Sequence, residues 1–339
     1  MKLLIRATNW VGDAIMALPA LRAVRSRFPE AQITILARPY VAAIYKNQQV
    51  CDEMMLVDYK SDMVNELRAH KFDAALLLQN AFEAAWFAWR AGIPERVGYA
   101  RDGRSLLLTK AVPVPKPGEI PAHEQYYYLE LLRRAGWLDS LPSESFIQLI
   151  VPDENRKHAA EFLHSAGARP DGFRIAVGAG ASYGSAKCWQ PDRFAELANR
   201  LQAQTGAEVI LFGTPSEATV SLAIAAGMRT PPIDLTGKTS IVDLPAVLSQ
   251  CHLFIGNDSG AMHVAAAVGL PVVAIFGPTD PLGTAPVTPR CSIVREKPYC
   301  SPCFLRRCPT DHRCMNGVTP DAVEAAARQW IPSNEVRPA

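Results

Sequence analysis

The sequence predicts an α/β protein made of two halves, each a parallel sheet with helices on both faces. The length of 339 residues suits two domains of ordinary size. Segments that read as strand, turn, helix and strand recur in both halves. Polar turns rich in glycine follow several of the predicted strands, at the carboxyl ends where such sheets bind ligands. The simplest architecture is therefore two doubly wound sheets with a cleft between them.

The first half opens with a predicted strand at residues 2–7, a turn at 8–13 and a helix at 14–28. Apolar residues recur at spacings of three in that helix, and basic residues occupy its other face. The remaining elements predicted here are strands at 32–36, 53–57, 74–78 and 96–99 and helices at 79–89 and 124–135. Pro142 and Pro152 bracket the expected boundary, so we assign the first domain to residues 1–150.

The second half repeats the alternation of strands and helices. Its predicted strands cover 174–177, 208–212, 252–255 and 272–276, and its predicted helices cover 154–166, 193–204, 241–249 and 262–268. A helix between consecutive strands implies parallel pairing, because the chain must cross back before the next strand begins. We assign this domain to residues 151–318 and a closing helix to 319–332.

The composition is that of a soluble enzyme. Apolar residues make up 49% of the chain, charged residues 20%, and the net charge is +2, so bulk charge does not indicate a nucleic-acid partner. No apolar run approaches the roughly 20 residues that span a bilayer. Arg6 and Asp13 interrupt any signal-peptide core. We therefore expect a cytoplasmic protein whose eight cysteines are mostly reduced.

The turn after the strand at 252–255 carries the strongest indication of a ligand. It places Asp258, Ser259 and Gly260 at a helix N-terminus, where free N–H groups and the helix dipole favour a phosphate. His263 follows one turn later, and its side chain can face the same anion. The alternative is an ordinary capped helix without a ligand, since Asp and Ser are common N-caps.

A glycine-rich loop follows the strand at 174–177 and predicts a second part of the same site. It would bring Ser182, Tyr183 and Lys187 over a diphosphate, with Lys187 supplying a compact charge for the leaving group. The alternative for Lys187 is an exposed surface lysine. The loop also resembles a nicotinamide fingerprint followed by a Tyr-x-x-x-Lys pair, but these two features overlap here, whereas dehydrogenases need them far apart in sequence.

Three further features have both a functional and a structural interpretation. Glu217 could bind ribose hydroxyls or cap a helix, and Asp13 could act in a ligand site or cap the helix after a tight turn at Gly12. Trp86 and Trp89, with basic residues nearby, could form an acceptor or lipid-headgroup surface or belong to a core helix. The chain has no Asp-x-Asp motif, so a metal on the diphosphate is not indicated.

Four late cysteines have almost the spacing of metal ligands. They are Cys300, Cys303, Cys308 and Cys314. A structural zinc or iron–sulfur site is one interpretation, and reduced thiols packed in a loop are the expected one.

At this point the motifs together resemble the family 9 glycosyltransferases over essentially the whole chain. The matching segments are Asn9-Trp-Val-Gly-Asp13, Ala186-Lys187-x-Trp189, Asn257-Asp-Ser-Gly-x-Met-His263 and Phe276-Gly-Pro278. The segment Ala91-Gly-Ile-Pro-x-Arg96 and the late cysteines look like the type II subgroup of the family. One departure is Tyr183, at a place where some relatives carry a small hydroxyl residue.

The resemblance implies a GT-B fold, in which two Rossmann-like domains bind the acceptor and the nucleotide-sugar. It implies inverting transfer of L-glycero-D-manno-heptose from ADP-heptose to the first heptose of the lipopolysaccharide inner core. The acceptor would be lipid A–Kdo–heptose, met at the cytoplasmic face of the inner membrane, and no cofactor is implied. The alternatives are transfer of a different heptose and a non-catalytic nucleotide-sugar binding protein.

The resemblance also implies a role for each candidate residue. Asp13, next to Gly12, would be the general base. Ser182, Tyr183 and Lys187 would hold the phosphates, Glu217 the adenosine ribose, Asp258 the heptose hydroxyls, and Ser259, Gly260 and His263 the pyrophosphate.

Overall fold

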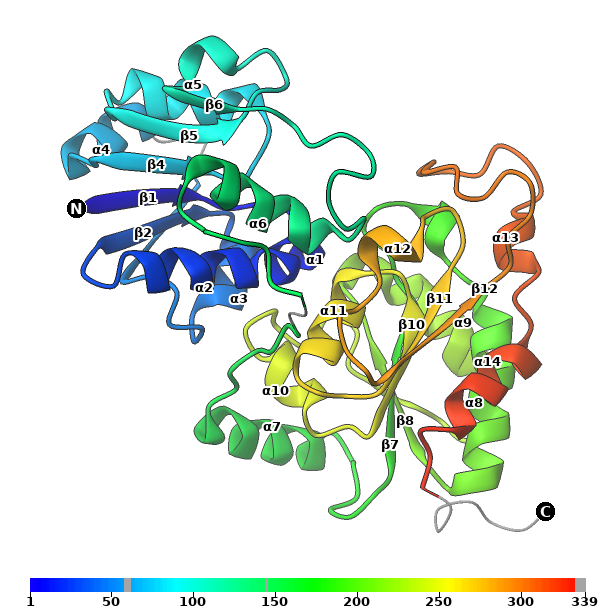
Figure 1. Ribbon diagram of the computed structural model, residues 1–339. Coiled ribbons are helices and arrows are strands. Elements are labelled where there is room, and N and C mark those ends of the chain that lie inside the picture. The colour runs from blue at the N-terminus through cyan, green and yellow to red at the C-terminus, as the bar shows by residue number, and fades with distance from the viewer. Residues whose placement is uncertain (58–61, 144–145, 333–339) are drawn as a thin grey trace. The chain divides into compact units, whose positions relative to one another are not determined.

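The computed structural model describes residues 1–57, 62–143 and 146–332. The chain divides into two compact units, residues 1–147 and residues 148–339. Each unit contains one six-stranded parallel sheet with helices packed on it, as the ribbon in Figure 1 displays. The division falls three residues before the boundary we expected at residue 150.

The first unit has strand order β3-β2-β1-β4-β5-β6. Its strands are β1 (Lys2–Arg6), β2 (Gln32–Ala37), β3 (Glu53–Leu56), β4 (Ala74–Leu77), β5 (Glu95–Tyr99) and β6 (Lys110–Val112). Its helices are α1 (Val11–Met16), α2 (Leu18–Arg27), α3 (Pro39–Tyr45), α4 (Met63–His70), α5 (Phe82–Arg90) and α6 (Glu124–Ala135). Because β1 lies between β2 and β4, the turns after β1 and β4 meet where the strand order reverses, which is the expected ligand edge.

The second unit has strand order β12-β11-β10-β7-β8-β9. Its strands are β7 (Arg174–Gly178), β8 (Glu208–Phe212), β9 (Ile233–Asp234), β10 (Leu253–Asn257), β11 (Val272–Phe276) and β12 (Cys291–Arg295). Its helices are α7 (Asp153–Ser165), α8 (Pro191–Thr205), α9 (Ala218–Gly227), α10 (Leu244–Leu248), α11 (Gly260–Ala267), α12 (Pro281–Thr284), α13 (Arg313–Asn316) and α14 (Pro320–Arg328). Here the strand order reverses between β7 and β10, which pair in parallel.

The core of the second unit fixes the ends of these strands. Every residue of β10 and β11 is buried. Trp189 is also buried; its indole N–H donates to the Val318 carbonyl at 2.9 Å, and its ring packs edge-on against Phe194. The closing helix α14 contacts α8, β11 and β12 and belongs to this unit. Within the described residues, no helix is both long and apolar enough to cross a membrane.

In the first unit, two predicted helices begin at other residues or are broken. The helix expected at 14–28 is two helices, α1 and α2, because Pro19 lies at the start of α2 and lacks the N–H that would continue the first helix. The helix expected at 79–89 begins at Phe82. The buried Arg104 guanidinium binds the Gln79 carbonyl and the Asn80 side chain, and this holds both residues in a turn.

Candidate functional site

Asn257 joins the two loops that meet at the reversal between β7 and β10. Its side chain is fully buried at the end of β10. Its side-chain NH2 group donates to the Ala179 carbonyl at 2.6 Å, and its side-chain oxygen accepts from the backbone N–H of Trp189 at 3.1 Å. The loop between Ala179 and Trp189 is therefore held at both ends against β10. We call residues 179–189 the phosphate loop, and this arrangement places it beside the N-terminus of α11.

Lys187 and Asp258 form a buried ion pair at the same edge. The Lys187 Nζ lies 2.5 Å from the Asp258 Oδ2, and the Thr279 hydroxyl donates to that oxygen at 2.6 Å. All three residues are buried. Lys187 is therefore not the exposed surface lysine of the alternative interpretation. The pairing also means that its charge is balanced by Asp258.

The N-terminus of α11 is suited to an anion. Ser259 is the N-cap residue, but its side chain makes no capping hydrogen bond. The Ser259 hydroxyl oxygen is buried and has no hydrogen-bond partner among the described residues. The N–H groups at the start of α11, from Gly260 onwards, have no partner within the helix. Buried His263 lies one turn further along. A ligand with anionic oxygens would satisfy these donors.

Glu217 caps its own turn and also reaches the phosphate loop. Its carboxylate accepts from the Thr214 N–H at 2.6 Å and from the Thr214 hydroxyl at 2.9 Å, which is the capping role considered as one alternative. A Cβ on Gly180 would lie 1.7 Å from the Glu217 Oε1, so a larger residue here would require the Glu217 side chain to move. Binding of a ribose by Glu217 stays a prediction.

Ser182 and Tyr183 lie on the phosphate loop but differ in their surroundings. Ser182 is exposed. The Tyr183 hydroxyl donates to the Phe304 carbonyl at 2.5 Å, and the Tyr183 ring lies 4.8 Å from the Lys187 Nζ. This contact could not be predicted from local sequence, because the two hydrogen-bonded residues are 121 positions apart.

Gly12 and Asp13 lie in the first unit, in the first turn of α1 at the carboxyl end of β1. Trp10, rather than Asp13, occupies the N-cap position. The carboxyl of Glu124, at the start of α6, has its pKa raised to about 7 by burial and then by the negative charge of Asp13. Glu124 could not be identified from the sequence, because only the folded chain brings α6 close to α1.

The four late cysteines are all free thiols. Cys300 and Cys303 are exposed and Cys314 is buried, whereas Cys308 is partly exposed. Hydrogen bonds from Thr310 lower the pKa of the Cys308 thiol. Across residues 1–57, 62–143 and 146–332, no group of His, Cys, Asp or Glu side chains is arranged to hold a metal ion.

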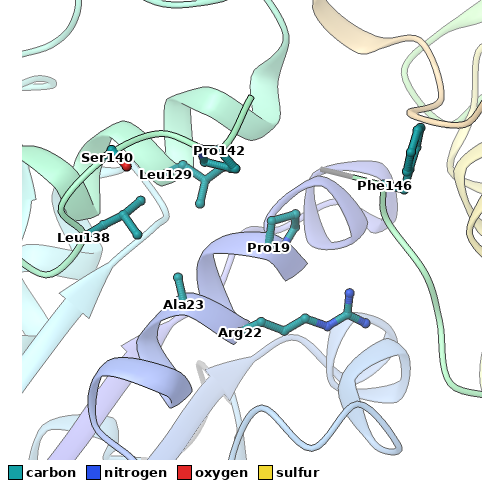
Figure 2. Close-up of a pocket in the computed structure, with 8 residues that line it drawn as sticks. All are labelled: Pro19, Arg22, Ala23, Leu129, Leu138, Ser140, Pro142 and Phe146. Carbon is teal, nitrogen blue, oxygen red and sulfur yellow. The ribbon is translucent and has the colours of Figure 1, made fainter. Parts of the chain in front are cut away.

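A separate open pocket of about 470 Å³ lies on the first unit, between α2 and α6. Figure 2 displays its largely apolar lining, which is made by Pro19, Arg22, Ala23, Leu129, Leu138, Ser140, Pro142 and Phe146. Burial lowers the pKa of the Arg22 guanidinium. None of the predicted site residues lines this pocket, and its apolar lining is a poor match for a sugar diphosphate.

Comparison with known proteins decides the family. The model of Glycosyltransferase family 9 (heptosyltransferase) matches residues 61–313. The chain belongs to this family. As a family 9 glycosyltransferase it is an enzyme that transfers a sugar, which disfavours the dehydrogenase interpretation of the glycine loop. The matched range covers the phosphate loop, α11 and three of the four late cysteines, since it ends one residue before Cys314.

Two relatives and one solved structure are similar to this chain over most of its length. The chain is 28% identical over 313 residues to lipopolysaccharide heptosyltransferase 2 of Escherichia coli K12, covering 87% of this chain and 88% of that one. It is 26% identical to lipopolysaccharide heptosyltransferase 3 of E. coli, covering 79% and 81%. The solved structure of E. coli ADP-heptose lps heptosyltransferase II superposes with a TM-score of 0.83 at 26% identity, over 97% of this chain and 98% of that chain. These likenesses agree with a GT-B arrangement of two Rossmann-like units.

Proposed function

We propose that this family 9 glycosyltransferase moves L-glycero-D-manno-heptose from ADP-heptose to the first heptose of the lipopolysaccharide inner core, with inversion at the anomeric carbon. The buried Lys187–Asp258 pair lies beside the Ser259 hydroxyl, which has no hydrogen-bond partner among the residues that the structure describes, and this is the observation that carries the donor half of the proposal. It joins a cation, a carboxylate and anion-binding donors, which are the groups that a sugar diphosphate requires. The names of the relatives support heptose as the sugar.

In the proposed reaction, the acceptor hydroxyl oxygen attacks the anomeric carbon as the bond from that carbon to the diphosphate oxygen breaks. Asp13 takes the hydroxyl proton, for which its carboxylate must be ionised and within hydrogen-bond reach of that hydroxyl. ADP leaves with additional negative charge. Lys187, Ser182 and the N–H groups at the start of α11 would stabilise that charge, and fixed donors of this kind are the larger catalytic contribution.

The donor's other groups are assigned to residues around this centre. Asp258 would accept from heptose hydroxyls while keeping its contact with Lys187. His263 and Gly260 would contact the pyrophosphate, and Glu217 would accept from the ribose hydroxyls. No metal is part of the proposal, because the chain has no Asp-x-Asp motif and cationic side chains take its place.

We further propose that the protein meets its lipid-linked acceptor at the cytoplasmic face of the inner membrane. The exposed face of α5 supports this. Phe82, Trp86 and Trp89 follow one another at spacings of four and three and are 47%, 37% and 46% exposed. The Arg90 guanidinium lies 5.9 Å from the Trp86 ring centroid. Tryptophan rings and arginines are typical of surfaces that lie at a membrane interface.

Two assays test the proposal. The first measures ADP release with ADP-heptose, ADP-mannose or UDP-glucose as donor and an inner-core acceptor that carries one heptose. Release of the nucleoside diphosphate from ADP-heptose, but not from the other two donors, supports the donor assignment. No release from any of the three donors would favour a nucleotide-sugar binding protein. The second compares acceptors ending in Kdo, in the first heptose and in the second heptose. Preference for either of the other two would assign the enzyme to a different heptose transfer.

A further inference from the structure

A segment between β12 and α13 connects both sides of the predicted donor site. We call residues 299–312 the cysteine loop, and it can be followed in Figure 1 between those two elements. On one side it is attached to the chain just after β11. The Ser301 hydroxyl donates to the Gly277 carbonyl at 2.6 Å. The N–H groups of Cys303 and Phe304 donate to the Pro278 carbonyl at 3.0 and 2.8 Å.

On its other side the cysteine loop is attached to the phosphate loop. The Ala186 N–H donates to the Arg306 carbonyl at 3.1 Å, and the His312 ring hydrogen-bonds through its Nε2 to the Ala186 carbonyl at 2.7 Å. A Cβ on Gly184 would lie 2.2 Å from the Arg306 carbonyl oxygen, so only glycine permits this approach. Together with the hydrogen bond from the Tyr183 hydroxyl to the Phe304 carbonyl, these contacts hold the backbone of Arg306 beside the phosphate loop.

Where the phosphate loop and the cysteine loop meet, two positive charges, those of Lys187 and Arg306, differ in how far they are neutralised. The Lys187 ammonium is paired with Asp258. The Arg306 guanidinium carbon lies 5.5 Å from the centroid of the Tyr183 ring, the same ring that Lys187 approaches. Arg306 is exposed and makes no ion pair within the part of the chain that the structure describes. Its positive charge is therefore available to a ligand, whereas that of Lys187 is largely balanced.

We propose that Arg306 binds the diphosphate of the nucleotide donor and that Tyr183 is the residue that positions it. This inference rests on the proposed function, because it assumes a nucleoside diphosphate in the site. A diphosphate carries at least two negative charges, and the buried ion pair leaves little net positive charge to meet them. A guanidinium can donate two parallel hydrogen bonds to phosphate oxygens, which an ammonium cannot do. Tyr183 then serves as an aromatic surface that holds Lys187 of the phosphate loop and Arg306 of the cysteine loop close to each other.

Calorimetric titration of the full-length protein with ADP, AMP and adenosine tests this assignment. We expect Arg306→Ala to weaken ADP binding by about tenfold or more, because a lost hydrogen bond to a charged group is worth about 1.5–3 kcal/mol. AMP binding should weaken less, and adenosine binding should not change. Arg306→Lys should recover part of the ADP affinity. Arg307→Ala is the matched control, since Arg307 is the neighbouring exposed arginine.

Tyr183→Phe provides a second test, because it keeps the ring but removes the hydroxyl bond to Phe304. We expect a smaller loss that is again selective for ADP. Equal weakening of ADP and adenosine binding in Arg306→Ala would indicate a structural role and overturn the proposal. Equal ADP affinity of Arg306→Ala and Arg307→Ala would also overturn it while leaving the proposed function intact. Failure of the wild-type protein to bind ADP would overturn both.

Discussion

The buried Lys187–Asp258 pair makes a quantitative prediction about stability. The Lys187 side chain is 11% exposed and the Asp258 side chain 4%, and the Lys187 Nζ lies 2.5 Å from the Asp258 Oδ2. Removing one partner of such a pair leaves an uncompensated buried charge, which costs about 3–5 kcal/mol. Asp258→Ala should therefore lower the free energy of unfolding of the second unit by about this amount. That is a large part of the 5–15 kcal/mol typical of a whole domain.

A double variant separates the contribution of the ion pair to stability from the other effects of replacing Lys187 and Asp258. Lys187→Met leaves Asp258 with its hydrogen bond from Thr279, and Asp258→Asn keeps the shape and can still accept from Thr279. The double variant Lys187→Met/Asp258→Asn contains neither charge. We expect it to lose less stability than the sum of the two single variants, because each single variant includes the penalty of one isolated charge.

Urea unfolding followed by far-UV circular dichroism measures these differences. The transition that ADP shifts in the wild-type protein is assigned to the second unit. Asp311→Asn is the control, because it breaks the exposed ion pair of Asp311 with Arg313 in the same unit and should leave the midpoint close to that of the wild type. A loss below about 1 kcal/mol in Asp258→Ala, or strict additivity in the double variant, would refute the argument.

Two further predictions concern the first unit. The Glu124 pKa of about 7, above its ordinary 4.5, means that the folded state holds a proton which the unfolded chain releases, so stability falls as pH rises through this interval. Glu124→Gln should flatten that fall in urea unfolding between about pH 5 and about pH 8; an unchanged slope would contradict the assignment to Glu124. Trp86→Ser with Trp89→Ser should reduce flotation with vesicles that contain anionic lipid, whereas Leu222→Ser, which alters an exposed leucine of the second unit, should not. Equal flotation of both variants would exclude the α5 face as the membrane contact.

The turns of the donor site could be predicted from the sequence, because their chemistry is local. Gly178 ends β7 and Gly180 lies in the turn after it, and Asp258 and Ser259 mark the start of a helix after β10. Parallel pairing of β7 with β10 then brings the two turns together. Among the described edge strands, β3 was predicted at 53–57, but β9 was not, because its two residues are too few for any periodicity.

The contacts between distant segments could not be predicted either. Lys187 and Asp258 are 71 positions apart, and nothing in either local sequence indicates that one will neutralise the other. The same holds for Tyr183 and Phe304. Glu124 looks like an ordinary residue at a helix start, and only its burial near Asp13 in the fold gives it an unusual pKa.

The most direct test of the central claim compares the wild type with Asp13→Asn, using ADP-heptose and an acceptor that carries the first heptose. Mass spectrometry of the acceptor measures heptose transfer, and calorimetry measures donor binding. We predict that the wild type adds one heptose, and that Asp13→Asn binds ADP-heptose normally but loses turnover by about two orders of magnitude or more. Near-normal turnover in Asp13→Asn, or an acceptor that gains no heptose from the wild type, would contradict the account.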